Sequence, residues 1–307
     1  MTQVPWDLFP SDFVDKDSKE STACGMLFMP RNLELQAVLM ARIESVFKKA
    51  HFNVKGWRDV PTDDSMLGPV SKEHVPDIKQ IIVHSGSSTK VFDKRLYNAR
   101  REIQNIFREF KCDDDAYVCS LSRKVIVYKG MLRSADLSKF FLDLTNPLYR
   151  SSFAIYHRRF STNTTPKWWL AQPMRVLAHN GEINTLLGNI NWVKSREYAF
   201  RHAQQAAKAN SSRSSSRSGN NAFFGPDSPA LTSSRRDKGP RVDVGRSDSA
   251  NLDSVVENYM HAGFSVEEAM MVLVPEAYAH QPRLKNEAAV RAFYTYWESI
   301  QVCVEVY

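Results

Sequence analysis

The chain has 307 residues, of which 43% are hydrophobic and 24% are charged, an ordinary globular composition with enough length for one large domain or two small ones. No run reaches the roughly 20 consecutive apolar residues of a membrane-spanning helix, and the first 30 residues are too acidic and interrupted for a signal peptide. The four cysteines form no C-x-x-C pair and do not cluster with histidines, which indicates neither a zinc site nor a disulfide framework and predicts a reducing compartment.

Predicted helices and strands alternate in the first half of the chain. Apolar residues recur at helical spacing from Leu33 to Ala50, after the start signals Pro30 and Asn32. A second helix is expected at about 93–110. Short apolar runs bounded by turn residues predict four strands, the last two forming a hairpin, at 52–60, 78–84, 116–121 and 124–128.

After these strands, a short helix is predicted near 135–144. The range 209–246 is rich in serine, arginine, glycine and proline, offers little apolar surface to a core, and is predicted to be a disordered insertion. The remaining predictions are strands at 152–157 and 174–178 and helices near 185–207, 250–262 and 265–273.

The formal charge of +7 is concentrated in the insertion. Between Lys208 and Arg246 there are eight basic residues and three acidic ones, so the rest of the chain is close to balanced. Such a stretch raises the hypothesis of nucleic-acid binding. Aromatic side chains that could stack on bases are confined to Phe223 and Phe224, and no recognised module surrounds them. We therefore expect no nucleic-acid partner.

Asn180 and Gly181 lie between a predicted strand and a predicted helix. An amide side chain beside an unhindered backbone N–H can form an oxyanion hole, because two fixed donors stabilise the negative oxygen of a tetrahedral intermediate. Asn-Gly is also among the commonest turn dipeptides, and taken alone the pair is better explained as a plain turn.

Two further positions could bind the charged groups of a small substrate. Arg159 follows a predicted strand, where its planar guanidinium could hold a carboxylate through two hydrogen bonds. Strand alternation would send the neighbouring Arg158 to the opposite face, so one of the two is expected to be a solvated charge. Asp248 precedes a predicted helix, where it could bind an ammonium group, although taken alone it is better explained as a helix N-cap.

Read together and in chain order, three motifs resemble the signature of glutamate synthases. They are His157-Arg-Arg-Phe-Ser-Thr-Asn-Thr164, Ala178-His-Asn-Gly-Glu-Ile-Asn-Thr185 and Ser247-Asp-Ser-Ala250. A supporting match is Ile126-Val-Tyr-Lys-Gly-Met131, and the resemblance covers about residues 3–300 apart from the insertion.

The resemblance implies a class II, N-terminal nucleophile glutamine amidotransferase domain spanning 1–307. Its expected fold is α+β, an αββα sandwich of two stacked antiparallel sheets covered by helices, incomplete at the nucleophile-bearing end. By the same resemblance, Asn180 and Gly181 would form the oxyanion hole, Arg159 would bind the α-carboxylate of L-glutamine, and Asp248 would bind its α-ammonium group. An N-terminal cysteine would attack the carboxamide, release ammonia and leave a glutamyl thioester for water to open.

The resemblance also implies partners beyond this chain. In complete family members, separate synthase domains use the ammonia to convert 2-oxoglutarate to glutamate with FMN and an iron–sulfur cluster. None of these groups, and no metal, is expected to bind here, and no membrane is expected as a partner. The compartment would be cytoplasm or plastid, and the sequence does not distinguish ferredoxin from a nicotinamide cofactor as electron donor.

Cys24-Gly25 superficially resembles the Cys-Gly start of the family. A free α-amine would require cleavage after Ala23, and Met29 to Asn32 resemble an internal family segment, so the nucleophile is expected upstream of Met1. Cys24 is then expected to be a small core residue at the start of a strand. The tail also departs from the family pattern, so we expect a fragment, truncated at both ends and inactive alone. The alternative is a catalytically silent or regulatory remnant that still binds glutamine.

Overall fold

The computed structural model describes residues 4–14, 16–86, 89–160, 165–179, 191, 194–195, 242, 246–274 and 286–301. The chain divides into two compact units. Unit 1 comprises Met1–Gly181 with Ser233–Gly239, and unit 2 comprises Glu182–Thr232 with Pro240–Tyr307.

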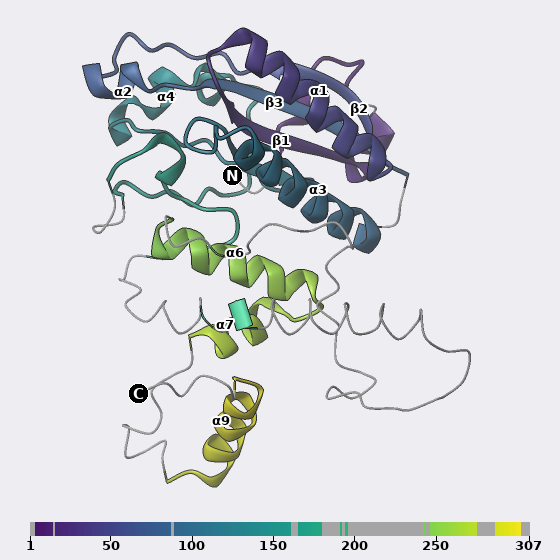
Figure 1. Cartoon of the computed structure of the whole chain (residues 1–307), viewed down its shortest axis with the longest axis vertical. Helices are drawn as coiled ribbons and strands as arrows, with labels where there is room; N and C mark the ends of the chain where they lie inside the picture. Colours follow the sequence, from purple (N-terminus) through teal and green to yellow (C-terminus); the bar gives the residue numbers. More distant parts are fainter. Residues whose placement is uncertain are drawn as a thin grey trace. The chain divides into compact units, whose positions relative to one another are not determined.

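Unit 1 is built on a four-stranded antiparallel sheet (Figure 1). The central strand β1 pairs with β3 on one side and with β4 on the other, and β2 pairs with β3. Helices and antiparallel strands together confirm the α+β class. In spatial order the strands are β2 (Asn53–Asp59), β3 (Asp77–His84), β1 (Thr22–Met29) and β4 (Tyr117–Ser122).

Strand β1 shows how the side chains divide between the two faces of the sheet. All eight of its residues are buried. Ala23 and Leu27 belong to the core on one face, whereas Cys24 and Met26 belong to the core on the other. This is the two-residue alternation of a strand, and it places apolar packing on both sides of the sheet.

Two long helices pack on the first face. They are α1 (Leu33–Lys49) and α3 (Thr89–Glu109), which confirm the two helices predicted from periodicity. The α1 helix begins after Asn32, whose side-chain oxygen accepts a hydrogen bond from the Leu35 N–H at 2.9 Å. The buried side chains of α1 include Leu39, Ile43 and Phe47, at the four-residue spacing that keeps them on one side.

Loops and short helices pack on the second face. The helix predicted at 135–144 forms as three shorter turns, η3, α4 and η4. Gly56 of β2 permits close packing here, because a Cβ at that position would lie 2.2 Å from the Phe13 ring. The short helices of unit 1 are η1 (Trp6–Leu8), η2 (Lys16–Ser21), α2 (Pro69–Glu73), η3 (Ser134–Asp136), α4 (Leu137–Phe140), η4 (Leu142–Thr145) and η5 (Trp168–Leu170).

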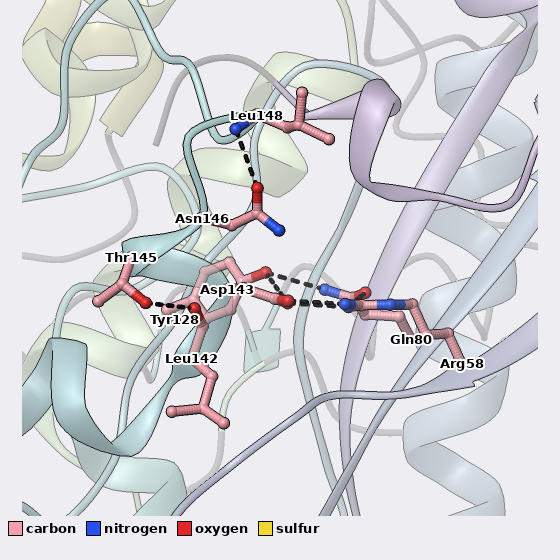
Figure 2. A network of polar contacts seen from close by, with 8 residues as sticks. All are labelled: Arg58, Gln80, Tyr128, Leu142, Asp143, Thr145, Asn146 and Leu148. Carbon is pink, nitrogen blue, oxygen red and sulfur yellow. Dashed lines mark hydrogen bonds and ion pairs between the residues drawn. The ribbon is translucent and has the colours of Figure 1, made fainter.

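A buried polar network attaches η4 to the sheet (Figure 2). Arg58 of β2 forms two hydrogen bonds with the Asp143 carboxylate, at 2.6 and 2.8 Å, and a third with Gln80 of β3 at 2.8 Å. The Tyr128 hydroxyl donates to Asp143 at 2.9 Å and accepts from Gln80 at 3.1 Å. The Asp143 side chain is only 2% exposed, so this pair lies largely out of solvent. The hydrogen bonds that Arg58 donates to Asp143 raise the pKa of Arg58, which remains a guanidinium cation.

Unit 2 is helical in the part that the structure describes. Helices α6 (Asp248–His261) and α7 (Val266–Leu273) confirm the predictions near 250–262 and 265–273, and α9 (Ala288–Gln301) was not predicted. The α7 helix begins with a capping box in which Ser265 and Glu268 exchange side-chain-to-backbone hydrogen bonds.

Two predicted features fall mostly outside the described residues. Of the helix predicted at 185–207, the structure describes residues 191, 194 and 195, which are helical. Of the insertion, it describes Val242, which is buried, and Arg246.

The predicted strand at 124–128 is wrong, and with it the hairpin. The backbone N–H groups of Lys124 and Val125 donate to the Ser122 hydroxyl, and that of Val127 donates to the Ser120 hydroxyl. Serine side chains of β4 therefore take the donors that a hairpin ladder would have used.

The predicted strands at 152–157 and 174–178 are also wrong, because neither segment joins a β-ladder in the described residues. A strand requires a hydrogen-bonding neighbour as well as a suitable composition. In the first segment, Phe153 and Tyr156 are 59% and 75% exposed. In the second, Met174 is buried and Arg175 donates to the Tyr117 hydroxyl, so side chains rather than a ladder attach this segment to β4.

Candidate functional site

Arg159 lies on the surface of unit 1. Its backbone N–H donates to the Nδ1 of His157 at 3.2 Å, which forms a local turn. Its side chain is exposed and forms no hydrogen bond or ion pair within the described part of the chain. We expected Arg158 and Arg159 to point to opposite faces of a strand. This expectation is wrong, because the segment is not a strand and both side chains are exposed. A guanidinium in this state is available for a carboxylate ligand.

Asp248 is the first residue of α6, and it is not the N-cap. Ser247 caps the helix instead, because its hydroxyl accepts from the Ala250 N–H at 3.2 Å. The Asp248 side chain is half-buried and has neither a hydrogen bond nor an ion pair among the described residues. The capping explanation of Asp248 is therefore wrong, and its carboxylate stabilises no other described residue through a hydrogen bond or ion pair.

Asn180 and Gly181 lie outside the described residues, which stop at His179 on this side. Their role as oxyanion-hole donors stays a prediction. Arg159 belongs to unit 1 and Asp248 belongs to unit 2, so their convergence on one ligand also stays a prediction.

Cys24 is a core residue of β1, as expected from the sequence. It pairs with Ile82 of β3 and Ser122 of β4, and it is 0% exposed. Burial raises the pKa of the Cys24 thiol far above its ordinary value, so the reactive thiolate is suppressed. Gly25 has its own packing reason, since a Cβ there would lie 2.7 Å from Ile81. The Cys-Gly pair is thus explained by the packing of a central strand.

The other two described cysteines, Cys112 and Cys119, are also buried. Burial raises the pKa of Cys112 to about 11 and that of Cys119 to about 12. Neither thiol is poised for nucleophilic attack at neutral pH.

The described residues contain neither a candidate metal cluster nor a candidate membrane-spanning helix. No group of three or more histidine, cysteine or acidic side chains there could hold a metal ion. None of the helices described is both long and apolar enough to cross a membrane.

Sequence reasoning missed Lys129, a buried cation that lies close to the segment leading to Asn180. It is 3% exposed, and its ammonium donates to the Trp169 carbonyl oxygen at 2.8 Å. The available signal was a lysine directly after the apolar run Ile126-Val-Tyr128, within the supporting motif match at 126–131.

Comparison with known proteins gives a consistent result. The family model of class-II glutamine amidotransferases matches residues 1–223 and 222–303. The chain is 41% identical over 306 residues to the chloroplastic ferredoxin-dependent glutamate synthase of Oryza sativa subsp. japonica. It is 42% identical over 307 residues to ferredoxin-dependent glutamate synthase 2 of Synechocystis sp.. These alignments cover 97% and 98% of this chain but only 17% and 18% of the relatives.

Proposed function

This chain belongs to the class-II glutamine amidotransferases, and we propose that it forms the glutamine-binding part of a glutaminase that supplies ammonia within a glutamate synthase. Arg159 would bind the α-carboxylate of L-glutamine, and Asp248 would bind its α-ammonium group. Asn180 and Gly181 would donate hydrogen bonds to the carboxamide oxygen, on which negative charge develops during attack.

The observation that carries this proposal is the state of Asp248. A half-buried carboxylate at the start of a helix would ordinarily cap that helix or join an ion pair. Here Ser247 performs the capping, and Asp248 has no partner among the described residues. A carboxylate in this position can accept charge-assisted hydrogen bonds from a cationic group. An α-ammonium group is the cation that an amino-acid substrate provides.

Arg159 provides the complementary charge. Its guanidinium is exposed and makes no ion pair among the described residues, so binding a carboxylate would break no ion pair with them. A bidentate arginine–carboxylate pair fixes orientation as well as charge. Together, one cation and one anion would select an α-amino acid over a simple amide.

We further propose that this chain by itself does not release ammonia from glutamine. The support is the state of the three cysteine thiols that the structure describes, since Cys24, Cys112 and Cys119 are buried with raised pKa values. The groups assigned above bind a substrate and stabilise an oxyanion, and none of them supplies the attacking atom. Such residual machinery leaves about 10³-fold acceleration over water in a serine hydrolase stripped of its triad, which for a slow amide hydrolysis is near the limit of detection.

The reaction of the whole protein is part of the proposal, because the chain spans less than a fifth of the relatives' length. The names of those relatives make ferredoxin the proposed electron donor. The described residues do not fit an iron–sulfur cluster, since no three potential ligands meet. We therefore do not assign the cluster to these residues, and no step of the proposed chemistry uses the cluster or FMN.

Two measurements on the purified chain test the proposal. Titration calorimetry should show saturable binding of L-glutamine, and an ammonia assay should show no release above that of Cys24→Ala. Binding without turnover would also be the property of a catalytically silent remnant. Turnover that disappears in Cys24→Ala would make Cys24 the nucleophile and overturn this account of its burial. Absence of glutamine binding would contradict the proposed roles of Arg159 and Asp248.

A further inference from the structure

We infer that Lys129 is a positioning residue for the glutamine site: its buried ammonium, with Arg175, fixes the segment 168–179 against Tyr117 of β4. This inference rests on the proposed function, which makes Asn180 and Gly181 the donors that follow this segment in the chain. It assigns these residues a positioning role and no contact with the substrate.

The first observation is the burial of an ammonium group without a counter-charge. Lys129 is 3% exposed, and no carboxylate pairs with it in the part of the chain that the structure describes. In the described part of the chain, its ammonium contacts the Trp169 carbonyl oxygen at 2.8 Å and the face of Tyr117, whose ring centroid is 4.5 Å from Nζ. A carbonyl dipole and an aromatic face compensate only in part for the lost hydration of the charge.

Packing alone does not require a lysine at this position. Methionine is unbranched and of similar length, and apolar replacements of buried charges are often neutral or stabilising. What methionine cannot do is donate a hydrogen bond to Trp169. The feature specific to lysine is therefore the attachment of the Trp169 backbone to the residues that follow β4.

Arg175 makes a second attachment to the same tyrosine. Its Nη1 donates to the Tyr117 hydroxyl at 2.9 Å, and its guanidinium carbon lies 6.0 Å from the ring centroid. The Trp169 ring packs on Tyr117 as well, at 5.8 Å between ring centroids. Tyr117 belongs to β4, so a strand of the sheet is the rigid element to which this segment is fixed.

The position of these attachments in the chain gives them a functional meaning. Trp169 and Arg175 are six residues apart, and Asn180 follows Arg175 by five residues. Hydrogen-bond donors stabilise a developing charge only when they are held in place beforehand. Two attachments to one strand, shortly before the proposed donors in the chain, can hold those donors in place. They require the burial of the Lys129 charge, which is unfavourable.

Three variants test this inference in the chain as it exists. Lys129→Met removes the hydrogen bond to Trp169 and keeps the bulk. Tyr117→Phe removes the acceptor for Arg175 and keeps the ring beneath Lys129. Lys139→Met is the matched control, because Lys139 is a lysine of the same unit whose side chain is 66% exposed. Each is compared with the unaltered chain by hydrogen–deuterium exchange, by calorimetry with L-glutamine and by thermal melting.

We expect Lys129→Met to speed exchange in peptides covering 168–179 and to weaken glutamine binding at least fivefold. Its melting temperature should be unchanged or higher, which a merely structural contact would not produce. Tyr117→Phe should weaken glutamine binding two- to threefold. Lys139→Met should change neither the exchange rate in 168–179 nor the affinity for glutamine. Should Lys129→Met fail to fold, Tyr117→Phe still decides whether the attachments control binding.

Unchanged exchange in 168–179 would overturn the attachment itself. Faster exchange with unchanged glutamine affinity would reduce Lys129 to a structural contact and overturn its positioning role. Absence of glutamine binding by the unaltered chain would contradict the proposed function and the positioning role with it. That result is distinguishable, because the exchange comparison needs no ligand and would still show whether Lys129 holds the segment.

Discussion

The two faces of the sheet in unit 1 are covered by different kinds of structure. One face packs against α1 and α3 through apolar side chains spaced at helical intervals. The other face packs against loops and short helices, and buried polar groups hold these in place, chiefly Arg58 with Asp143 and Lys129 with Trp169. A helix satisfies its own backbone and needs only an apolar stripe, whereas a loop must find partners for its polar groups.

The helical face should therefore depend on volume, and the loop face on charge and hydrogen bonding. The largest loss is expected for Phe47→Ala on the helical face, because Phe47 is 0% exposed and packs edge-on against Phe52 at 5.9 Å. Deleting a buried phenylalanine costs about 3–5 kcal/mol. Urea unfolding measures this loss, with the exposed neighbour Lys48→Ala as control. Equal losses of unfolding free energy in the two variants would show that Phe47 does not contribute to the core.

On the loop face, Asp143→Asn should cost about 3 kcal/mol, because it leaves the Arg58 guanidinium without its counter-charge. The expected loss of stability is smaller than for a fully buried pair, because the Arg58 side chain is 19% exposed. Replacing both partners, as Arg58→Met with Asp143→Leu, should recover most of the loss in urea unfolding. A double variant as unstable as Asp143→Asn would show that shape, rather than unpaired charge, governs this face.

Gly56→Ala should cost about 2 kcal/mol, because the added methyl group meets the Phe13 ring and overpacks the loop face. The double variant Gly56→Ala with Phe13→Leu offers space and should recover part of the stability. If the double variant lost as much stability as the two single variants together, the two positions would not be in direct contact.

The smallest effect is expected for the exposed ion pair between Lys167 and Asp114, whose side chains are 43% and 69% exposed. Lys167→Ala should change the free energy of unfolding by less than about 0.5 kcal/mol, because solvent and salt screen such pairs. A loss above about 1 kcal/mol that persists in 0.5 M salt would show that charge on the protein surface contributes more than this account allows.

The same contrast explains what the sequence predicted correctly. The helices at Leu33–Lys49 and Thr89–Glu109 were predictable, because their core positions repeat at helical spacing. The strand predicted at 124–128 has a suitable composition, but hydroxyl groups of Ser120 and Ser122 take its backbone donors. No periodicity encodes that exchange. Apolar composition at 152–157 likewise did not reveal whether a neighbouring strand would pair with it.

The candidate site was predictable to a different degree. Motif order made Arg159 and Asp248 the proposed binding residues, which stays a prediction, but local reasoning wrongly gave Asp248 the capping role that Ser247 performs. A serine immediately before an aspartate at a helix start leaves the identity of the cap open in the sequence. Lys129 was missed because its partner is a backbone carbonyl 40 positions away, and backbone partners leave no signature in side-chain patterns.

Ligand discrimination by Asp248 tests the central claim most directly. L-Glutamine and 4-carbamoylbutanoate differ only in the α-ammonium group, so the ratio of their dissociation constants isolates the contact proposed for Asp248. The account predicts that the unaltered chain prefers L-glutamine at least tenfold. It also predicts that Asp248→Asn abolishes the preference, while Glu267→Gln, at an exposed residue in the first turn of α7, retains it. An undiminished preference in Asp248→Asn would contradict the assignment of this carboxylate to the substrate ammonium group.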